Sequence, residues 1–240
     1  MKIKIAVLGS TGSIGKSTLE VIRKDKKNFD VILLSANNNY KKLIQQAKEF
    51  NVKNVLIKNK IFYERVKNSL KKNKTKVYSG DISITNIISG KLDYTMSAIV
   101  GVAGLQPTLD AIKISKTVAI ANKESIICGW DLLSKLIKRY KTKILPVDSE
   151  HFSIMELTKH TSDDEVEEII ITASGGPFLN TSLNKFKKIK PKHALKHPNW
   201  KMGKKISIDS STLMNKGFEV IEASKIFNFD IEKYKVIIHP

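Results

Sequence analysis

The spacing of apolar and polar positions along the chain predicts its fold. Residues 3–8 form an apolar run, and a stretch with helical spacing of apolar positions follows through Leu19 and Ile22. Short apolar runs and helical stretches then alternate up to about residue 147. Strands that alternate with helices predict a mostly parallel, doubly wound sheet. This part of the chain is therefore expected to adopt an α/β, Rossmann-like fold.

The same pattern gives approximate limits for domains and elements. Binary patterning gives way to polar loops at about residue 147, so we expect one domain over 1–147 and a second over 148–240. A chain of 240 residues can give each of them its own core. In the first domain we expect strands at 3–8, 30–35, 52–57, 76–78, 94–100 and 117–120, and a last strand that ends before 148. We expect helices that begin after residue 15, at 40–50, at 60–72, around Leu109 and Ile112, and at 123–140.

A glycine-rich loop joins the first expected strand to the first expected helix. It reads Gly9-Ser-Thr-Gly12-Ser-Ile-Gly15, and strand, loop and helix in this order are the context that a dinucleotide fingerprint requires. Gly9 permits the tight turn, Gly12 lets a pyrophosphate approach the backbone, and Gly15 allows close packing of the helix. Glycines spaced three and three are less diagnostic than Gly-x-Gly-x-x-Gly, so an ordinary βα turn is the alternative.

The end of the second expected strand bears on the choice of cofactor. In NAD enzymes an acid near this point holds the ribose hydroxyls, whereas the extra phosphate of NADP requires neutral or basic groups. Here the strand leads into Asn37, Asn38 and Asn39, and no acid ends it. This favours NADP, although asparagines are also ordinary turn formers.

Two carboxylates follow the last strand of the first domain. Asp148 and Glu150 are separated by Ser149 in the run from Lys143 to His151. In an extended backbone, side chains two apart point the same way, so both carboxylates are expected on one face. Two carboxylates at the end of a buried strand destabilise the fold unless a positive charge lies between them. A bound divalent cation usually provides this charge. The sequence thus predicts a metal site here.

Polar residues at two other strand ends are also candidates for binding. Asn122, Lys123 and Glu124 follow the strand at 117–120, at the edge of a parallel sheet where ligands bind, although the start of a surface helix explains them equally well. Ser174 lies in a loop of small residues whose N–H and hydroxyl groups suit an anion.

The stretch from His197 through Trp200 to Gly203 combines a titratable ring, a large indole and a flexible glycine. It fits either a mobile cover over a ligand or a small hydrophobic core around Trp200.

A helix expected after residue 208 presents three polar groups together. Asn215, Lys216 and Glu219 are three or four positions apart, so they can share one helical face. Amide, ammonium and carboxylate would then meet on that face. The alternative is a routine surface pair between Lys216 and Glu219 that stabilises the helix only slightly.

Composition limits the partners and the compartment. The net charge of +19 is typical of a nucleic-acid-binding protein. However, the 42 basic residues include only three arginines, and arginine is the residue that base and phosphate recognition favours. We therefore expect no nucleic-acid partner, and the charge can instead steer anionic small molecules. No apolar run approaches the ~20 residues that span a bilayer. The single cysteine, Cys128, suits a reducing compartment, so the cytoplasm is expected.

Taken together, the motifs resemble those of the 1-deoxy-D-xylulose 5-phosphate reductoisomerase family. The matching stretches follow the order of the family and extend over nearly the whole chain. They are GSTGSIG at 9–15, AIVGVAGLQPT at 98–108, ANKES at 121–125, LPVDSEH at 145–151, SGGPF at 174–178, HPNWKMGKKIS at 197–207, DSSTLMNKGFEVIEA at 209–223 and IIHP at 237–240.

The resemblance implies a metal and substrate site in the second domain. Asp148, Glu150 and Glu219 would hold Mg2+ or Mn2+, and they would form the catalytic set together with Lys123. Trp200 and Met202 would belong to a loop that closes over the site. The residues implied to bind the substrate are Ser149, Glu150, Ser174, His197, Ser210, Asn215, Lys216 and Glu219.

The resemblance also implies an NADPH site. The family often carries Gly-Lys-Asn after its second strand, and Asn37-Asn38-Asn39 stands there in this chain, so an expected basic partner for the 2′-phosphate is missing. The residues implied to bind the cofactor are Thr11, Gly12, Ser13, Ile14, Asn37, Asn38, Asn39, Asn122, Lys123, Glu124 and Gly203.

The implied activity is the NADPH- and metal-dependent isomerisation and reduction of 1-deoxy-D-xylulose 5-phosphate to 2-C-methyl-D-erythritol 4-phosphate. Members of the family are homodimers and are longer, with more of an α+β catalytic domain and a C-terminal helical domain. The chain is therefore expected to be incomplete, able to bind NADPH but weakly active or inactive. The alternatives are a simpler NADP-linked reductase, which would use the glycine loop but needs no converging carboxylates, and a lysine-rich nucleic-acid-binding module, which needs none of these acids.

Overall fold

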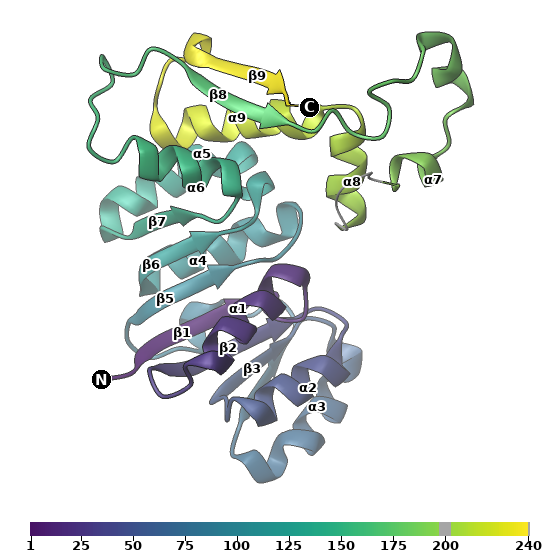
Figure 1. Cartoon of the computed structure of the whole chain (residues 1–240). Coiled ribbons are helices and arrows are strands. Elements are labelled where there is room, and N and C mark those ends of the chain that lie inside the picture. The colour runs from purple at the N-terminus through teal and green to yellow at the C-terminus, as the bar shows by residue number, and fades with distance from the viewer. Residues whose placement is uncertain (197–202, 240) are drawn as a thin grey trace. The chain divides into compact units, whose positions relative to one another are not determined.

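A computed structural model describes residues 1–196 and 203–239 of the chain (Figure 1). The chain forms two compact units, Met1–Val147 and Asp148–Pro240. Each unit has its own hydrophobic core. Within the described residues, no helix combines the length and the apolar content needed to cross a membrane.

The first unit contains a parallel sheet of seven strands. The strand order is β4-β3-β2-β1-β5-β6-β7, and each neighbouring pair runs parallel. The strands are β1 (Ile3–Leu8), β2 (Phe29–Ala36), β3 (Asn54–Ile57), β4 (Lys76–Ser79), β5 (Leu92–Ser97), β6 (Ser115–Ile120) and β7 (Lys143–Pro146). This confirms the predicted α/β, doubly wound fold.

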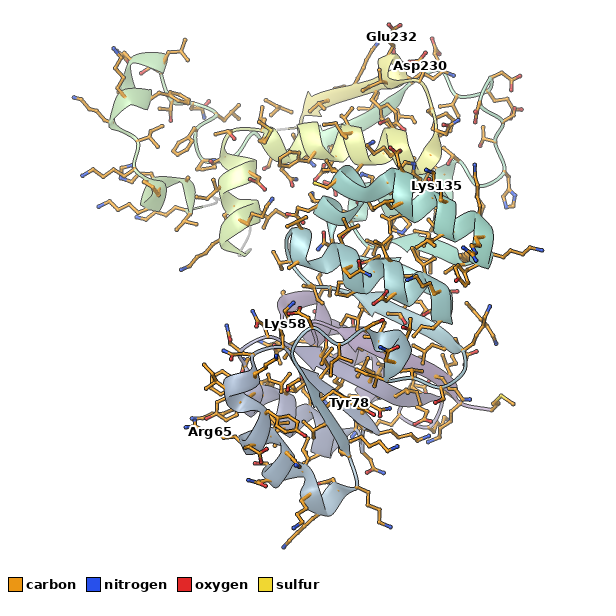
Figure 2. All side chains as sticks on the ribbon, turned by 180° about the vertical axis from the view of Figure 1, so that it is seen from behind. Lys58, Arg65, Tyr78, Lys135, Asp230 and Glu232 are labelled. Atoms are coloured by element: carbon orange, nitrogen blue, oxygen red, sulfur yellow. The ribbon has the colours of Figure 1, made fainter. Side chains whose placement is uncertain are left out.

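Helices connect these strands and cover the sheet (Figure 1). They are α1 (Ser13–Lys24), α2 (Tyr40–Glu49), α3 (Tyr63–Leu70), α4 (Leu105–Ile114) and α5 (Lys123–Tyr140). Helix α1 is amphipathic, because Leu19 and Ile22 are buried while Arg23 and Lys24 end it on the solvent side. Tyr78 lies on β4, at the edge of the sheet (Figure 2).

The strand order and the switch in winding direction have a functional consequence. Strand β1 pairs with β2 on one side and with β5 on the other. The chain therefore winds outward in both directions from β1, and ligands in such sheets bind at the carboxyl ends of the strands near this point. Strand β5 ends at Ser97 rather than at the predicted residue 100, which leaves Ala98–Val100 as a loop at that edge.

The second unit is a mixture of helices and a small sheet. Strands β8 (Ile169–Ala173) and β9 (Tyr234–Ile238) pair in parallel. Strand β8 alternates buried and exposed residues, and its buried Ile169 and Ile171 pack with Ile154, Ala223 and Phe229. Helix α9 runs along the strand pair (Figure 1). The helices of this unit are α6 (Ser149–Leu157), α7 (Pro191–Ala194), α8 (Lys204–Ser211) and α9 (Met214–Phe227).

One prediction about the backbone is wrong. Asp148, Ser149 and Glu150 do not continue an extended strand, because β7 ends at Pro146 and α6 begins at Ser149. Asp148 takes the N-cap position and Glu150 the first turn of α6, where negative side chains are favourable near the helix N-terminus.

Candidate functional site

The first unit has a cavity of about 490 Å³ at the carboxyl ends of its strands. This is the edge at which doubly wound sheets bind their ligands. The lining residues follow β1, β2, β3, β4 and β5, and include Gly9, Thr11, Gly12, Asn37, Lys58, Asp81, Ile84, Ala98 and Gln106. The polar glycine loop therefore faces a largely preformed space.

The glycine loop requires its glycines. Gly9 has a φ of +79°, and a Cβ atom there would lie 2.6 Å from the Ala98 backbone oxygen. A Cβ on Gly15 would lie 2.4 Å from the Gly9 backbone oxygen. Gly12 is the N-cap of α1, so the backbone N–H groups at the start of this helix point towards the loop. The loop can thus approach an anion through its backbone alone.

The other residues predicted for the cofactor have different environments. Thr11, Gly12 and Asn37 line the cavity. Ser13 and Ile14 begin α1 and are exposed. The Asn39 side chain accepts a hydrogen bond from the Lys42 backbone N–H at 3.2 Å, so this residue caps α2.

Asn122 is buried at the start of α5. Its Oδ1 accepts from the Ser125 backbone N–H at 2.8 Å, and its Nδ2 donates to the Gly101 backbone oxygen at 2.7 Å. The side chain therefore joins the start of α5 to the loop after β5. Lys123 and Glu124 form the first turn of α5 and are partly exposed. In the second unit, Gly203 is the N-cap of α8.

Three carboxylates come together in the second unit. Asp148, Glu150 and Glu219 each offer an oxygen, and these atoms lie within 4.8 Å of one another. Asp148 and Glu150 come from the start of α6, and Glu219 comes from α9, where it is 1% exposed. Hard oxygen ligands at this spacing suit Mg2+ or Mn2+. The donor set therefore fits a divalent ion.

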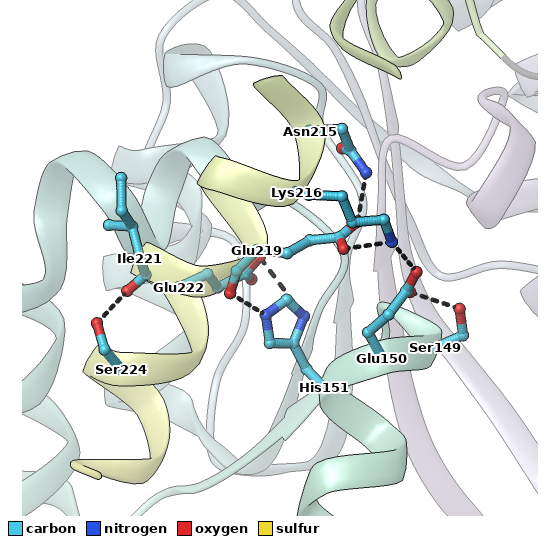
Figure 3. Close-up of polar contacts among 9 residues, drawn as sticks. All are labelled: Ser149, Glu150, His151, Asn215, Lys216, Glu219, Ile221, Glu222 and Ser224. Carbon is cyan, nitrogen blue, oxygen red and sulfur yellow. Dashed lines mark hydrogen bonds and ion pairs between the residues drawn. The ribbon is translucent and has the colours of Figure 1, made fainter. Parts of the chain in front are cut away.

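Lys216 places a positive charge between two of these carboxylates (Figure 3). Its Nζ donates to Glu150 Oε1 at 2.5 Å and to Glu219 Oε2 at 2.6 Å. Asn215 Nδ2 donates to the other Glu219 oxygen, so amide, ammonium and carboxylate share one face of α9 as the sequence predicts. The positive charge of the ammonium offsets the repulsion between the two carboxylates.

This arrangement changes the pKa values of both partners. Burial raises the pKa of Glu150, but the hydrogen bonds from Lys216 and Ser149 outweigh burial and bring the pKa down to about 2. Burial lowers the pKa of Lys216, and its hydrogen bonds to Glu150 and Glu219 outweigh that effect and raise the pKa. Both groups are therefore held in their charged forms.

The low pKa of Glu150 predicts how stability depends on pH in metal-free protein. A carboxyl whose pKa is depressed in the folded state stabilises the fold above its ordinary pKa of 4.5, and this contribution is lost as the pH falls toward 2. As the pH falls through this range, the free energy of unfolding should decrease in both proteins. The decrease in the Glu150→Gln variant should be smaller than in wild type by on the order of 2 kcal/mol. Urea unfolding with EDTA measures this, and Glu156→Gln, an exposed acid on α6, is the control. Identical pH profiles for Glu150→Gln and wild type would contradict the assignment.

Buried polar residues lie behind the carboxylates. His151 is 0% exposed, and its Nε2 lies 2.9 Å from the Glu219 backbone oxygen. Its Nδ1 lies 3.7 Å from Glu222 Oε2 (Figure 3). Asp148, His151 and Glu222 also form a second set of possible ligands. His151 ties α6 to the turn of α9 that carries Glu219.

The loop after β8 approaches the end of α8. Gly175 and Gly176 have φ values of +79° and +70°, and a Cβ on Gly176 would lie 2.6 Å from the Ser210 backbone oxygen. This close approach brings the loop that carries Ser174 next to Ser210. His197, Trp200 and Met202 lie outside the described residues.

The second unit has a cavity of about 780 Å³ between α6 and the segment that leads into β8. Ser149 and Glu150 line it, together with Glu165, Glu167 and Glu168. Acids on this wall would repel a phosphate. A phosphate group is therefore better accommodated by Lys216 and the serine loops.

Comparison with known proteins agrees with this geometry. The family model described as 1-deoxy-D-xylulose 5-phosphate reductoisomerase matches residues 5–129, and the model of the C-terminal domain of this enzyme matches residues 144–227. The chain belongs to the 1-deoxy-D-xylulose 5-phosphate reductoisomerase family. The resemblance inferred from the sequence motifs is thereby confirmed.

Curated and solved reductoisomerases resemble the chain over its whole length. The enzyme from Pelagibacter ubique is 56% identical over 239 residues, which cover 99% of this chain and 62% of that protein. The structure of the Zymomonas mobilis reductoisomerase in complex with NADPH has a TM-score of 0.92 and 42% identity, covering 100% of this chain and 62% of that one. A reductoisomerase complex with NADPH, fosmidomycin and magnesium has a TM-score of 0.88 and 36% identity, covering 99% and 61%. The chain thus spans about 62% of the length of these relatives.

Sequence reasoning missed two residues at the reductoisomerase carboxylate cluster. His151 and Glu222 are included in the sequence analysis only as parts of matching motifs, and neither of them is given a role there. A signal was available, because His151 follows Asp148 by three positions and Glu222 follows Glu219 by three positions. Once both stretches are recognised as helical, this spacing places each pair on a common face.

Proposed function

We propose that the full-length protein catalyses the NADPH- and divalent-metal-dependent conversion of 1-deoxy-D-xylulose 5-phosphate to 2-C-methyl-D-erythritol 4-phosphate. The convergence of Asp148, Glu150 and Glu219 carries this proposal, because neither a simple reductase nor a nucleic-acid-binding module needs it. The relatives with NADPH, or with NADPH, fosmidomycin and magnesium, support the choice of cofactors.

Asp148, Glu150 and Glu219 are the proposed ligands of Mg2+ or Mn2+. The ion pairs that Lys216 forms with Glu150 and Glu219 support this proposal, because these carboxylates attract a positive charge. A bound divalent ion would polarise the keto and hydroxyl oxygens of the substrate. The position of Glu219 on a buried turn fixes the geometry of this ligand before binding.

The remaining residues of the second unit are proposed to bind and orient the substrate. Ser149 begins α6 next to the carboxylates, and its hydroxyl donates to Glu150 Oε2 at 2.8 Å. Ser174, Ser210, Asn215 and Lys216 offer hydroxyl, amide and ammonium donors to the substrate phosphate, with His197 nearby. Trp200 and Met202 lie outside the described residues, and their proposed role in covering the substrate rests on the resemblance to the family.

The first unit is proposed to hold NADPH, which supplies hydride to the aldehyde formed by rearrangement of the substrate. Thr11, Gly12, Ser13 and Ile14 would contact the phosphates, and the cavity walls would enclose the adenosine portion. Asn122, Glu124 and Gly203 are proposed to lie further along the cofactor. Lys123 is proposed to contact substrate and cofactor and to support proton movement or offset charge.

The proposal extends to assembly and location. We place the protein in the cytoplasm, which the single cysteine supports. A homodimer is proposed from the resemblance to the family alone. The phosphorylated substrate is the expected partner, with no role for nucleic acid or membrane.

Lys216 is expected to compete with the metal ion. In Lys216→Met, two carboxylates lose the ammonium between them, so Mg2+ affinity should rise about tenfold while affinity for inorganic phosphate falls. Calorimetric titration of metal-free protein with each ligand measures both effects. Lys225→Met, in the last turn of α9, is the matched control. Weaker Mg2+ binding by Lys216→Met would contradict this arrangement.

The function is tested with the full-length protein by following NADPH oxidation with 1-deoxy-D-xylulose 5-phosphate, with and without Mg2+. Turnover that requires the substrate and the metal is expected. Asp148→Asn should abolish turnover while NADPH binding persists. NADPH oxidation without a metal requirement would support the simpler reductase, and absence of NADPH binding would reject both enzymes.

A further inference from the structure

The nucleotide cavity of the first unit contains a lysine to which the sequence pattern assigned no role. Lys58 directly follows β3 and lines the cavity together with Asn37, Gly12 and Thr11. Its backbone N–H donates to the Ala36 oxygen at 2.9 Å, which fixes it beside the end of β2. Figure 2 labels its position. A positive charge therefore lies one strand away from the asparagine run.

The asparagines themselves provide neutral donors and structural support. Asn39 caps α2, and the Asn38 Oδ1 accepts a hydrogen bond from Asn59 Nδ2 at 2.9 Å. The Asn59 backbone N–H also donates to the Asn37 oxygen at 3.2 Å. These contacts join the segment after β3 to the segment after β2. They also orient the Asn38 amide, whose nitrogen is a hydrogen-bond donor.

Asp81 is the ion-pair partner of Lys58. The two side chains form an ion pair, and they are 54% and 82% exposed. Asp81 follows β4 and lines the same cavity. An exposed ion pair contributes little to stability, so the ammonium can exchange this carboxylate for a phosphate dianion at small cost.

We infer that Lys58 binds the 2′-phosphate of NADPH and is the residue that selects NADPH over NADH in this chain. The inference rests on the proposed NADPH-binding function. Asn37–Asn39 lack a basic group, and Lys58 at the end of the neighbouring strand supplies one. Lys58 is a specificity residue, since the 2′-phosphate lies far from the transferred hydride.

The test is fluorescence titration of the full-length protein with NADPH and, separately, with NADH. Lys58→Met should weaken NADPH binding about tenfold, because a charged hydrogen bond is lost. NADH binding should change by less than about twofold. Lys58→Arg, which keeps the charge, should retain most of the preference. Asp81→Asn, which releases Lys58, should tighten NADPH binding without affecting NADH.

Lys53→Met is the matched control for net charge. Lys53 precedes β3 at its other end, is 64% exposed and pairs with Asp30 at 3.2 Å. The Lys53→Met variant should bind both NADPH and NADH with wild-type affinity. Equal NADPH affinity in Lys58→Met and wild type would overturn the assignment of Lys58 while leaving NADPH binding intact. Failure of the wild-type protein to bind either nucleotide would overturn the proposed function as well.

Discussion

Replacing Glu219 by glutamine is expected to reduce the affinity for Mg2+ and Mn2+ about a hundredfold and to abolish turnover. Mutating a residue that only hydrogen-bonds a metal ligand lowers metal affinity roughly 10–100-fold. This variant removes the charge of a proposed direct ligand, so its effect should be at least as large. Because Glu219 is 1% exposed, water cannot easily take its place. The amide of glutamine also presents an N–H group where Lys216 now donates at 2.6 Å.

Calorimetric titration of metal-free protein with Mn2+ measures the effect, and circular dichroism confirms that the variant is folded. Glu232→Gln removes an exposed acid from the same unit and should bind metal as wild type does (Figure 2). If Glu219→Gln bound Mn2+ as tightly as this control, Glu219 would not be a ligand, and Glu222 would become the acid to test.

Replacing Gly15 by alanine is expected to lower the free energy of unfolding by about 3 kcal/mol and to eliminate NADPH binding. The added Cβ would lie 2.4 Å from the Gly9 backbone oxygen and 2.6 Å from Ser10 Cα. Both atoms are backbone, so no side chain can turn away to make room. The glycine loop must instead shift, and it would then no longer fit a pyrophosphate.

Gly12→Ala separates binding from folding at the same loop. Its Cβ would lie 3.3 Å from the Gly9 oxygen, a contact that a small adjustment relieves. We expect this variant to unfold close to wild type but to bind NADPH weakly, because the new methyl group faces the cavity. Urea unfolding and NADPH titration distinguish the two variants. A Gly15→Ala protein with wild-type stability would contradict the close packing of α1 on the loop.

Strongly patterned segments made the first unit predictable. The run Asn54–Ile57 is buried throughout, as expected for a central parallel strand, and α5 begins and ends at the predicted Lys123 and Tyr140. Asn122 as N-cap and Lys141 in a left-handed conformation mark the ends of this helix. Local signals of this kind do not depend on distant contacts, which is why the sequence reveals them.

The residues from Asp148 to Glu150 show where pattern reasoning failed. Their alternation was read as a continuing strand, although an aspartate followed two residues later by a glutamate is also typical of a helix start. The convergence with Glu219 survived this error, because it depends on the packing of α6 against α9 rather than on strand periodicity. Lys58 and His151 have partners that are distant in sequence, Asp81 and Glu222, and no local pattern reveals such partners.

The small sheet of the second unit bears on how this polypeptide folds during synthesis. Strand β8 pairs only with β9 within the described residues, and Lys233 next to β9 donates to the Val166 oxygen over a separation of 67 residues. In the first unit, even the strand pair most distant in sequence, β1 with β5, is complete by Ser97, well before β8 begins. The N-terminal unit of a nascent chain should therefore fold before β9 has been synthesised. Until then β8 has no partner strand, and its apolar edge is exposed to chaperones.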